Sequence, residues 1–131
     1  MKKTVLLNSR ISKVIADMGH TQTLTIGDAG LPVPFGTEKI DLALVKGIPA
    51  FLDVLDAVLT ELCVERIVLA EEIKTVNPEM EEDILKRFPG IRVDYVPHEE
   101  FKEQTADSMA VIRTGETKAY SNIILVSGVT F

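Results

Sequence analysis

The sequence predicts an α/β protein with a mainly parallel sheet and helices on both faces. Short β-branched or continuously apolar segments alternate along the chain with segments of helical period. This alternation is typical of strands joined by covering helices. The length of 131 residues fits one domain, and no linker, repeat or low-complexity segment divides it. We therefore expect a single domain over residues 1–131.

The first half of the chain predicts two helices and two strands. Asn8 or Ser9 can cap a helix that Gly19 ends, with an apolar stripe formed by Ile11, Val14, Ile15 and Met18. Residues 21–27 and 39–44 predict strands. A second helix follows, and its apolar face comprises Phe51, Val54, Leu55, Val58 and Leu62.

The second half continues the alternation. Asn77 and Pro78 form a strong helix start, and a further helix is expected to begin near His98. An aromatic last residue, Phe131, favours a docked C-terminus. Four more strands are expected, at residues 67–70, 91–96, 110–114 and 123–126.

Composition limits the classes of partner. The net charge of −6 argues against nucleic acid and anionic membranes, because phosphate contacts need clustered Lys and Arg. No apolar run approaches the roughly 20 residues that span a bilayer. Cys63 is the only cysteine, so no intrachain disulfide can form, which fits a cytoplasmic protein. The apolar fraction of 46% suggests additional surface buried between subunits.

Motifs for cofactors and metals are absent from the sequence. It contains neither G-x-G-x-x-G nor G-x-x-x-x-G-K-[ST], so a nucleotide-phosphate cradle has no support. Two distant histidines and one cysteine offer no metal site of ordinary spacing. We expect no cofactor and no metal.

Two histidine-containing segments could carry chemistry. His20 lies where the first helix ends, and Asp28 lies in a Gly- and Pro-rich loop that can hold a carboxylate in place. Imidazole titrates near neutrality, and an aspartate can orient it or bind a substrate hydroxyl. His98 and Lys102 are four residues apart, on one face of a short helix. The same spacings also fit a helix-end histidine, a helix-start histidine and a solvated lysine.

A third polar pair is Tyr120 and Asn122, two residues apart and so on one face of an incipient strand. With the histidine segments it supplies the donors and acceptors that a neutral, polyhydroxylated ligand needs. The pair could equally be a strand aromatic and a turn residue. Glu71 and Glu72, after a buried strand, could form a carboxylate site or a solvated strand end.

The whole chain resembles the D-ribose pyranase family, without a large insertion. The segments that carry this resemblance are Leu7-Asn8-Ser9, Gly19-His20-Thr21, Asp28-Ala29-Gly30-Leu31-Pro32-Val33-Pro34, Ala70-Glu71-Glu72, His98-Glu99-Glu100-Phe101-Lys102, Ile112-Arg113-Thr114-Gly115-Glu116 and Tyr120-Ser121-Asn122-Ile123-Ile124-Leu125.

The resemblance implies an isomerase that interconverts the pyranose and furanose forms of D-ribose, so that furanose reaches ribokinase. It implies a cofactor-free reaction with His20 as proton donor, and a ring-like homo-oligomer, a decamer. The residues that it implies for holding the sugar are Asp28, His98, Lys102, Tyr120 and Asn122.

Other functions remain open at this point. The related fucose mutarotases share the region from Gly115 to Asn122 but lack the Pro-rich run after Asp28 and the His98 motif, and this chain has both. A non-catalytic sugar-binding or sensor module would use the same hydroxyl-binding groups. A structural oligomer whose histidines only pack is a third alternative.

Chain geometry constrains how His20 and Asp28 can cooperate. If residues 21–27 are extended, the two lie on the order of 20–26 Å apart at about 3.3 Å per residue. They share one site only if the chain bends sharply or a subunit contact completes the site. We expect the second, with Tyr120 and Asn122 also contributed across an interface.

Overall fold

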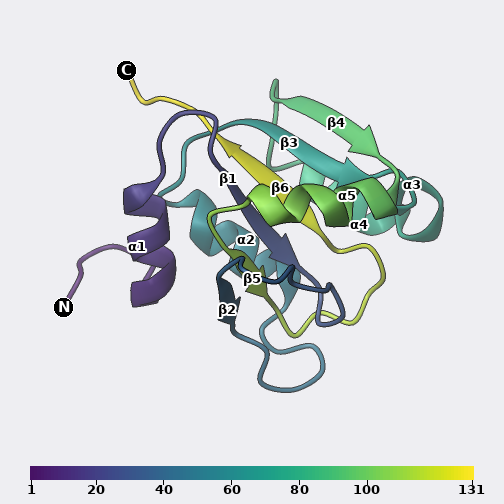
Figure 1. Cartoon of the computed structure of the whole chain (residues 1–131), viewed down its shortest axis with the longest axis horizontal. Helices are drawn as coiled ribbons and strands as arrows, with labels where there is room; N and C mark the ends of the chain where they lie inside the picture. Colours follow the sequence, from purple (N-terminus) through teal and green to yellow (C-terminus); the bar gives the residue numbers. More distant parts are fainter.

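A six-stranded sheet with helices on both faces forms the centre of the computed structural model, which describes all of residues 1–131 (Figure 1). The elements in chain order are α1 (Ser9–Asp17), β1 (Thr23–Gly27), β2 (Lys39–Asp41), α2 (Phe51–Leu59), β3 (Val64–Ala70), α3 (Ile73–Val76), α4 (Pro78–Leu85), β4 (Arg92–Val96), α5 (His98–Gln104), a 3₁₀ turn (Thr105–Asp107), β5 (Val111–Arg113) and β6 (Ile123–Ser127).

The strand order is β2-β5-β1-β6-β3-β4. Neighbouring strands are parallel except at β6, which runs antiparallel to both β1 and β3. The predicted single α/β domain with a mainly parallel sheet is therefore confirmed. Because β6 is reversed, its first residue lies at the edge where the other five strands end. We call this edge the carboxyl edge and the opposite one the amino edge.

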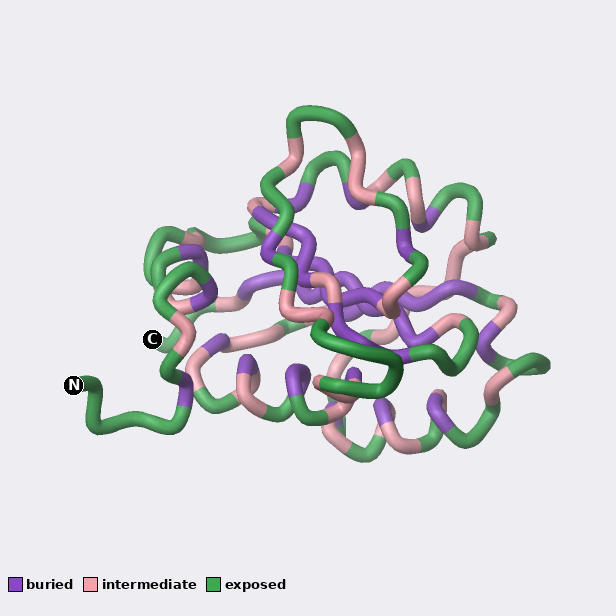
Figure 2. The backbone as a smooth tube through the Cα atoms, turned by 90° about the horizontal axis from the view of Figure 1, so that it is seen from below, coloured by how far each residue is buried: buried purple, intermediate pink, exposed green.

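The strands bury both of their faces, and the two faces differ in extent. Alternate residues of β3 point to opposite sides: Ile67 and Leu69 join a core of 21 buried residues, whereas Val68 joins a core of five. The larger core includes side chains of α1, α2 and α4, and the smaller one includes Phe101 of α5. Figure 2 shows the buried strands as a central layer between helical segments. The sheet is thus covered on both sides, as its continuously apolar strands require.

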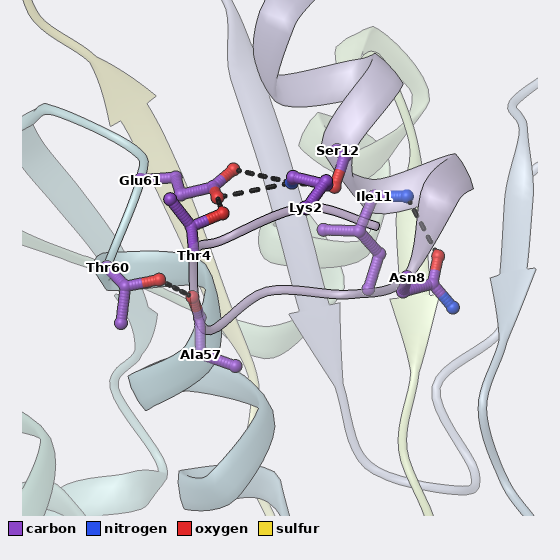
Figure 3. Close-up of polar contacts among 8 residues, drawn as sticks. All are labelled: Lys2, Thr4, Asn8, Ile11, Ser12, Ala57, Thr60 and Glu61. Carbon is purple, nitrogen blue, oxygen red and sulfur yellow. Dashed lines mark hydrogen bonds and ion pairs between the residues drawn. The ribbon is translucent and has the colours of Figure 1, made fainter.

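Local signals in the sequence fix several helix ends. The Asn8 side chain accepts a hydrogen bond from the Ile11 backbone N–H, and Asn77 does the same for Met80 at the start of α4. The segment before α1 is tied to the turn that follows α2, because Lys2 and Thr4 both contact the Glu61 carboxylate (Figure 3). Capping residues that were readable from the sequence therefore act where they were expected.

Three features differ from the expectations. The second strand ends at Asp41 rather than near residue 44, and a short helix, α3, follows β3 where no helix was predicted. Phe131 is fully exposed, so the prediction of a docked C-terminus is wrong. The chain leaves the sheet after Ser127 and its last three residues are exposed, so no segment covers the Phe131 ring. No helix is long and apolar enough to cross a membrane.

Candidate functional site

Most of the candidate residues gather at the carboxyl edge. Asp28 directly follows β1, His98 comes two residues after β4, and Asn122 directly precedes the reversed strand β6. In open α/β sheets, ligands bind in the crevice outside the carboxyl ends of the strands. The topology thus brings together residues that are up to 94 positions apart in the chain.

Asp28 and Asn122 form the most firmly held pair at this edge. The Asn122 Oδ1 atom accepts from the Asp28 backbone N–H at 2.8 Å, and its Nδ2 donates to Asp28 Oδ2 at 3.2 Å. Asn122 is only 1% exposed. Gly27 permits this approach, since a Cβ there would lie 2.5 Å from Leu31 Cδ2 and 3.1 Å from Asn122 Oδ1. The Asp28 Oδ1 atom also accepts from the Gly30 N–H, so the loop is locked around its carboxylate.

His98 and Tyr120 form an aromatic pair beside them. Their ring centroids are 5.1 Å apart in an edge-to-face arrangement, and the His98 ring also stacks on Phe101 at 6.1 Å. The Nδ1 atom of His98 is buried and makes no hydrogen bond within the chain. A buried ring nitrogen without a partner calls for an explanation, and a hydrogen bond to a ligand hydroxyl or to a bound water would supply one.

Lys102 lies one turn after His98 in α5, as the spacing predicted. Its Nζ atom pairs with Glu99 Oε1 at 2.7 Å, and this hydrogen bond lowers the pKa of the Glu99 carboxyl. The Lys102 side chain is 30% exposed. Its place four residues after His98 puts Lys102 on the same face of α5, where its ammonium forms an ion pair with the exposed Glu99 carboxylate.

Tyr120 and Asn122 were expected on an incipient strand, and that expectation is wrong. Tyr120 has a left-handed φ of +57°, and the Asn122 N–H bonds back to the Tyr120 carbonyl at 2.9 Å. The two residues therefore lie in a turn before β6. A side chain in the left-handed region is unusual for a bulky residue and marks a locally constrained position.

His20 lies at the amino edge, apart from the other candidates. The N–H of the next residue, Thr21, bonds to the Ser127 carbonyl at the far end of β6 from Asn122. The His20 Nε2 atom is 2.9 Å from Glu65 Oε2, and both side chains are about half exposed. A cleft of about 390 Å³ adjoins His20, lined also by Met18, Leu62, Cys63, Gly128 and Phe131.

β1 lies between His20 and Asp28, but it covers only Thr23–Gly27, because Thr21 has a left-handed φ of +67° and lies in a turn, so the extended stretch is shorter than the expected residues 21–27. Both ends are fixed by the register of β1 against β6, which pairs Thr23 with Val126 and Ile26 with Ile123. Asp28 and Asn122 bond within one chain, as do the rings of His98 and Tyr120. Tyr120 and Asn122 therefore come from the same chain as Asp28, because the reversed strand supplies them locally. That a subunit interface brings them together with His20 stays a prediction.

Some residues that shape the site were missed. Glu116 is 7% exposed, and its carboxylate accepts from the Phe51 and Lys118 N–H groups at 3.2 Å each. Its carbonyl accepts from the Ala29 N–H at 2.8 Å, which ties the loop before Tyr120 to the Asp28 loop. Of Glu71 and Glu72, the first is a solvated strand end, whereas the second bonds to the His98 N–H. Nothing local in the sequence distinguishes these buried contacts from surface carboxylates.

Known proteins resemble this chain over its whole length. The model of the RbsD / FucU transport protein family matches residues 1–130. A D-ribose pyranase of Oenococcus oeni is 59% identical over 131 residues, covering all of both chains.

Solved structures extend the match to three dimensions. The structure of Bacillus subtilis RbsD complexed with D-ribose superposes with a TM-score of 0.97 at 48% identity, covering all of both chains. A fucose mutarotase from Streptococcus pneumoniae in complex with L-fucose has a TM-score of 0.76 at 23% identity, covering 97% of this chain and 96% of that one. The second match concerns the fold alone.

Proposed function

Because this chain belongs to the RbsD / FucU transport protein family, we propose that it is a D-ribose pyranase, an isomerase that interconverts the pyranose and furanose forms of D-ribose. The observation that carries this proposal is the full-length identity of 59% to a D-ribose pyranase. The Bacillus subtilis relative complexed with D-ribose supports the same sugar.

The chemistry of the carboxyl edge supports a sugar ligand. Asp28 offers carboxylate acceptors, Asn122 an amide, Tyr120 a phenol and Lys102 an amine, and the Nδ1 atom of His98 has no partner. Each sugar hydroxyl needs both a donor and an acceptor, and this set supplies them. In this proposal these five residues hold the sugar.

Ring interconversion needs only proton transfers. The ring oxygen gains a proton as its bond to the anomeric carbon breaks, and a base takes the proton of the anomeric hydroxyl. A different hydroxyl then closes on the carbonyl by the reverse steps. His20 acts as the proton donor in this proposal, because an imidazole near neutrality contributes about 10²–10⁴-fold as a general acid.

We propose that two copies of the chain complete the site. His20 is at the amino edge and the sugar-holding residues are at the carboxyl edge, so a neighbouring copy must present its His20 to Asp28. A homodecamer in the cytoplasm, supplying furanose to ribokinase, is the assembly and setting proposed. Exposed apolar side chains near both edges, among them Leu44, Ile48, Val129 and Phe131, offer surface for such contacts.

Magnetisation exchange by NMR between the pyranose and furanose resonances of ribose tests the activity. We expect catalytic amounts of protein to accelerate this exchange, with fucose anomers as the control. Acceleration of fucose anomer exchange alone would move the protein to the mutarotase alternative. Line broadening from binding without exchange would favour the sensor alternative.

Analytical ultracentrifugation combined with this assay tests the shared site. We expect activity to follow the oligomer as the protein is diluted. A fully active monomer would contradict the contribution of His20 from a second copy.

A further inference from the structure

The short helix α3 is the element that sequence patterns did not anticipate. It lies between β3 and α4, and Ile73 anchors it with a side chain that is 0% exposed. Its flanking residues, Glu72 and Asn77, both direct their side chains to segments of the candidate site. We call residues 72–77 the brace.

At its first residue, the brace holds the start of α5. Both oxygens of Glu72 accept from the His98 backbone N–H, at 3.1 and 3.0 Å. His98 is the first residue of α5, and the residue before it is Pro97, whose side chain makes no capping bond. Glu72 therefore supplies from elsewhere in the chain the acceptor that a helix start lacks. The backbone of His98 is fixed by it.

At its last residue, the brace holds the turn that carries Tyr120. The Asn77 Oδ1 atom accepts from Met80 N–H at 3.3 Å, and its Nδ2 donates to the Ala119 carbonyl at 2.9 Å. Ala119 directly precedes Tyr120, which has the left-handed φ of +57°. The direction of the tyrosine ring therefore depends on a backbone that Asn77 holds.

We propose that the brace sets the relative position of the His98 and Tyr120 rings, with Glu72 and Asn77 as positioning residues for sugar binding. The two rings meet edge to face at 5.1 Å, although 22 residues separate them in the chain. The two residues that flank this short helix contact the His98 backbone N–H and the Ala119 carbonyl just before Tyr120. This inference rests on the proposed ribose pyranase function.

Glu72 is tested by a pair of variants and a matched control. Glu72→Ala removes the acceptor, and we expect the KM for ribose to rise about fivefold with kcat little changed, from the loss of one charge-assisted hydrogen bond. Glu72→Gln keeps one acceptor oxygen and should restore part of the affinity. The control is Glu71→Ala: Glu71 directly precedes Glu72, is exposed and makes no side-chain hydrogen bond, so this variant should leave the KM for ribose unchanged. Equal KM values for all three variants and the wild type would overturn the proposal.

Asn77 offers a variant that separates positioning from stability. Asn77→Asp keeps an oxygen to cap α4 but loses the Nδ2 donor to Ala119, whereas Asn77→Ala loses both. We expect both variants to raise KM about equally, and only Asn77→Ala to lower the melting temperature clearly. If KM rises only in the less stable variant, the contact is merely structural and the positioning role is wrong.

A direct structural readout keeps this test independent of catalysis. In ¹H–¹⁵N spectra of the full-length protein, Glu72→Ala should shift the His98 amide resonance and Asn77→Asp the Tyr120 amide resonance, and Glu71→Ala should shift neither. Absence of ribose exchange in the wild type would refute the proposed function while leaving these shifts to decide the geometry. If the wild type catalyses exchange and Asn77→Asp leaves the Tyr120 amide resonance unshifted, the proposal that the brace positions Tyr120 is wrong.

Discussion

The carboxyl and amino edges of the sheet hold their candidate residues in different ways. At the carboxyl edge, Asn122 is 1% exposed and makes two hydrogen bonds to Asp28, while the His98 and Tyr120 rings are in contact. At the amino edge, the His20 side chain is 52% exposed and has a single partner, Glu65, which is 43% exposed. The candidate residues at the carboxyl edge are held by contacts within the chain, whereas His20 at the amino edge is half exposed to solvent.

This difference follows from how each edge is built. The carboxyl edge collects loops from several strands, so buried backbone groups there need side-chain partners and find them in Asn122 and Glu116. Toward the amino edge, the polar contacts His20–Glu65, Arg66–Asp94 and Arg92–Asp94 all join partly exposed side chains. A fixed group of residues at one edge and an exposed imidazole at the other are what the proposed site shared between two copies would require.

His20→Ala should have the largest effect on activity. Removing a general acid is expected to slow pyranose–furanose exchange by about 10²–10⁴-fold. Ribose binding, measured by calorimetry, should persist because the residues proposed to hold the sugar lie at the other edge. Loss of binding with no separate loss of turnover would contradict the proton-donor role.

Asn122→Ala should have the largest effect on stability among these variants. It leaves the Asp28 N–H without its partner in a part-buried position, which costs about 1–3 kcal/mol. Urea unfolding measures this loss, and ribose affinity should fall with it. Asn8→Ala, which removes only the cap of α1, is the matched control and should cost about 1 kcal/mol without changing affinity. Equal ribose affinities in the two variants would show that the carboxyl edge is not organised by Asn122.

Glu65→Ala should have a smaller effect, because its contact with His20 is half exposed. An exposed pair contributes about 0.2–1 kcal/mol, so we expect at most a fivefold fall in exchange rate and little change in stability. Steady-state exchange rates at saturating ribose measure the effect. A loss as large as that of His20→Ala would mean that the amino edge is organised within one chain after all.

Asp94→Asn should have the smallest effect, and the size of that effect depends on pH. The hydrogen bond from Arg66 lowers the pKa of Asp94 below its ordinary 3.8, with Arg92 adding to it. Because the pKa of Asp94 is lower in the folded state, its carboxylate stabilises the folded protein at pH values above the ordinary pKa of 3.8. That contribution is lost as the pH falls through the folded-state pKa. The variant should therefore be less stable by about 0.5 kcal/mol at pH 7 and equal to the wild type in strong acid. A pH series of urea unfolding curves checks this, and a gap that widened toward acid would refute it.

Much of the fold was readable from local patterns. The cap at Asn8, the Asn77-Pro78 start and the apolar runs of β3 and β6 each depend on neighbours a few residues away, and the structure confirms them. The helix α3 was not readable, because four residues without a cap or a long apolar stripe carry too little periodic signal. The left-handed turn at Tyr120 was missed for a related reason, since bulky residues rarely adopt it.

The sequence by itself determined the α/β class, the positions of most elements and the chemical types of the candidate residues. Only the tertiary structure decided that β6 runs antiparallel, and so that Asn122 meets Asp28 while His20 lies at the opposite edge. Periodicity records which face of an element is buried, because that depends on residues close in the chain. Strand order and direction depend instead on contacts between distant segments, and no local pattern encodes them.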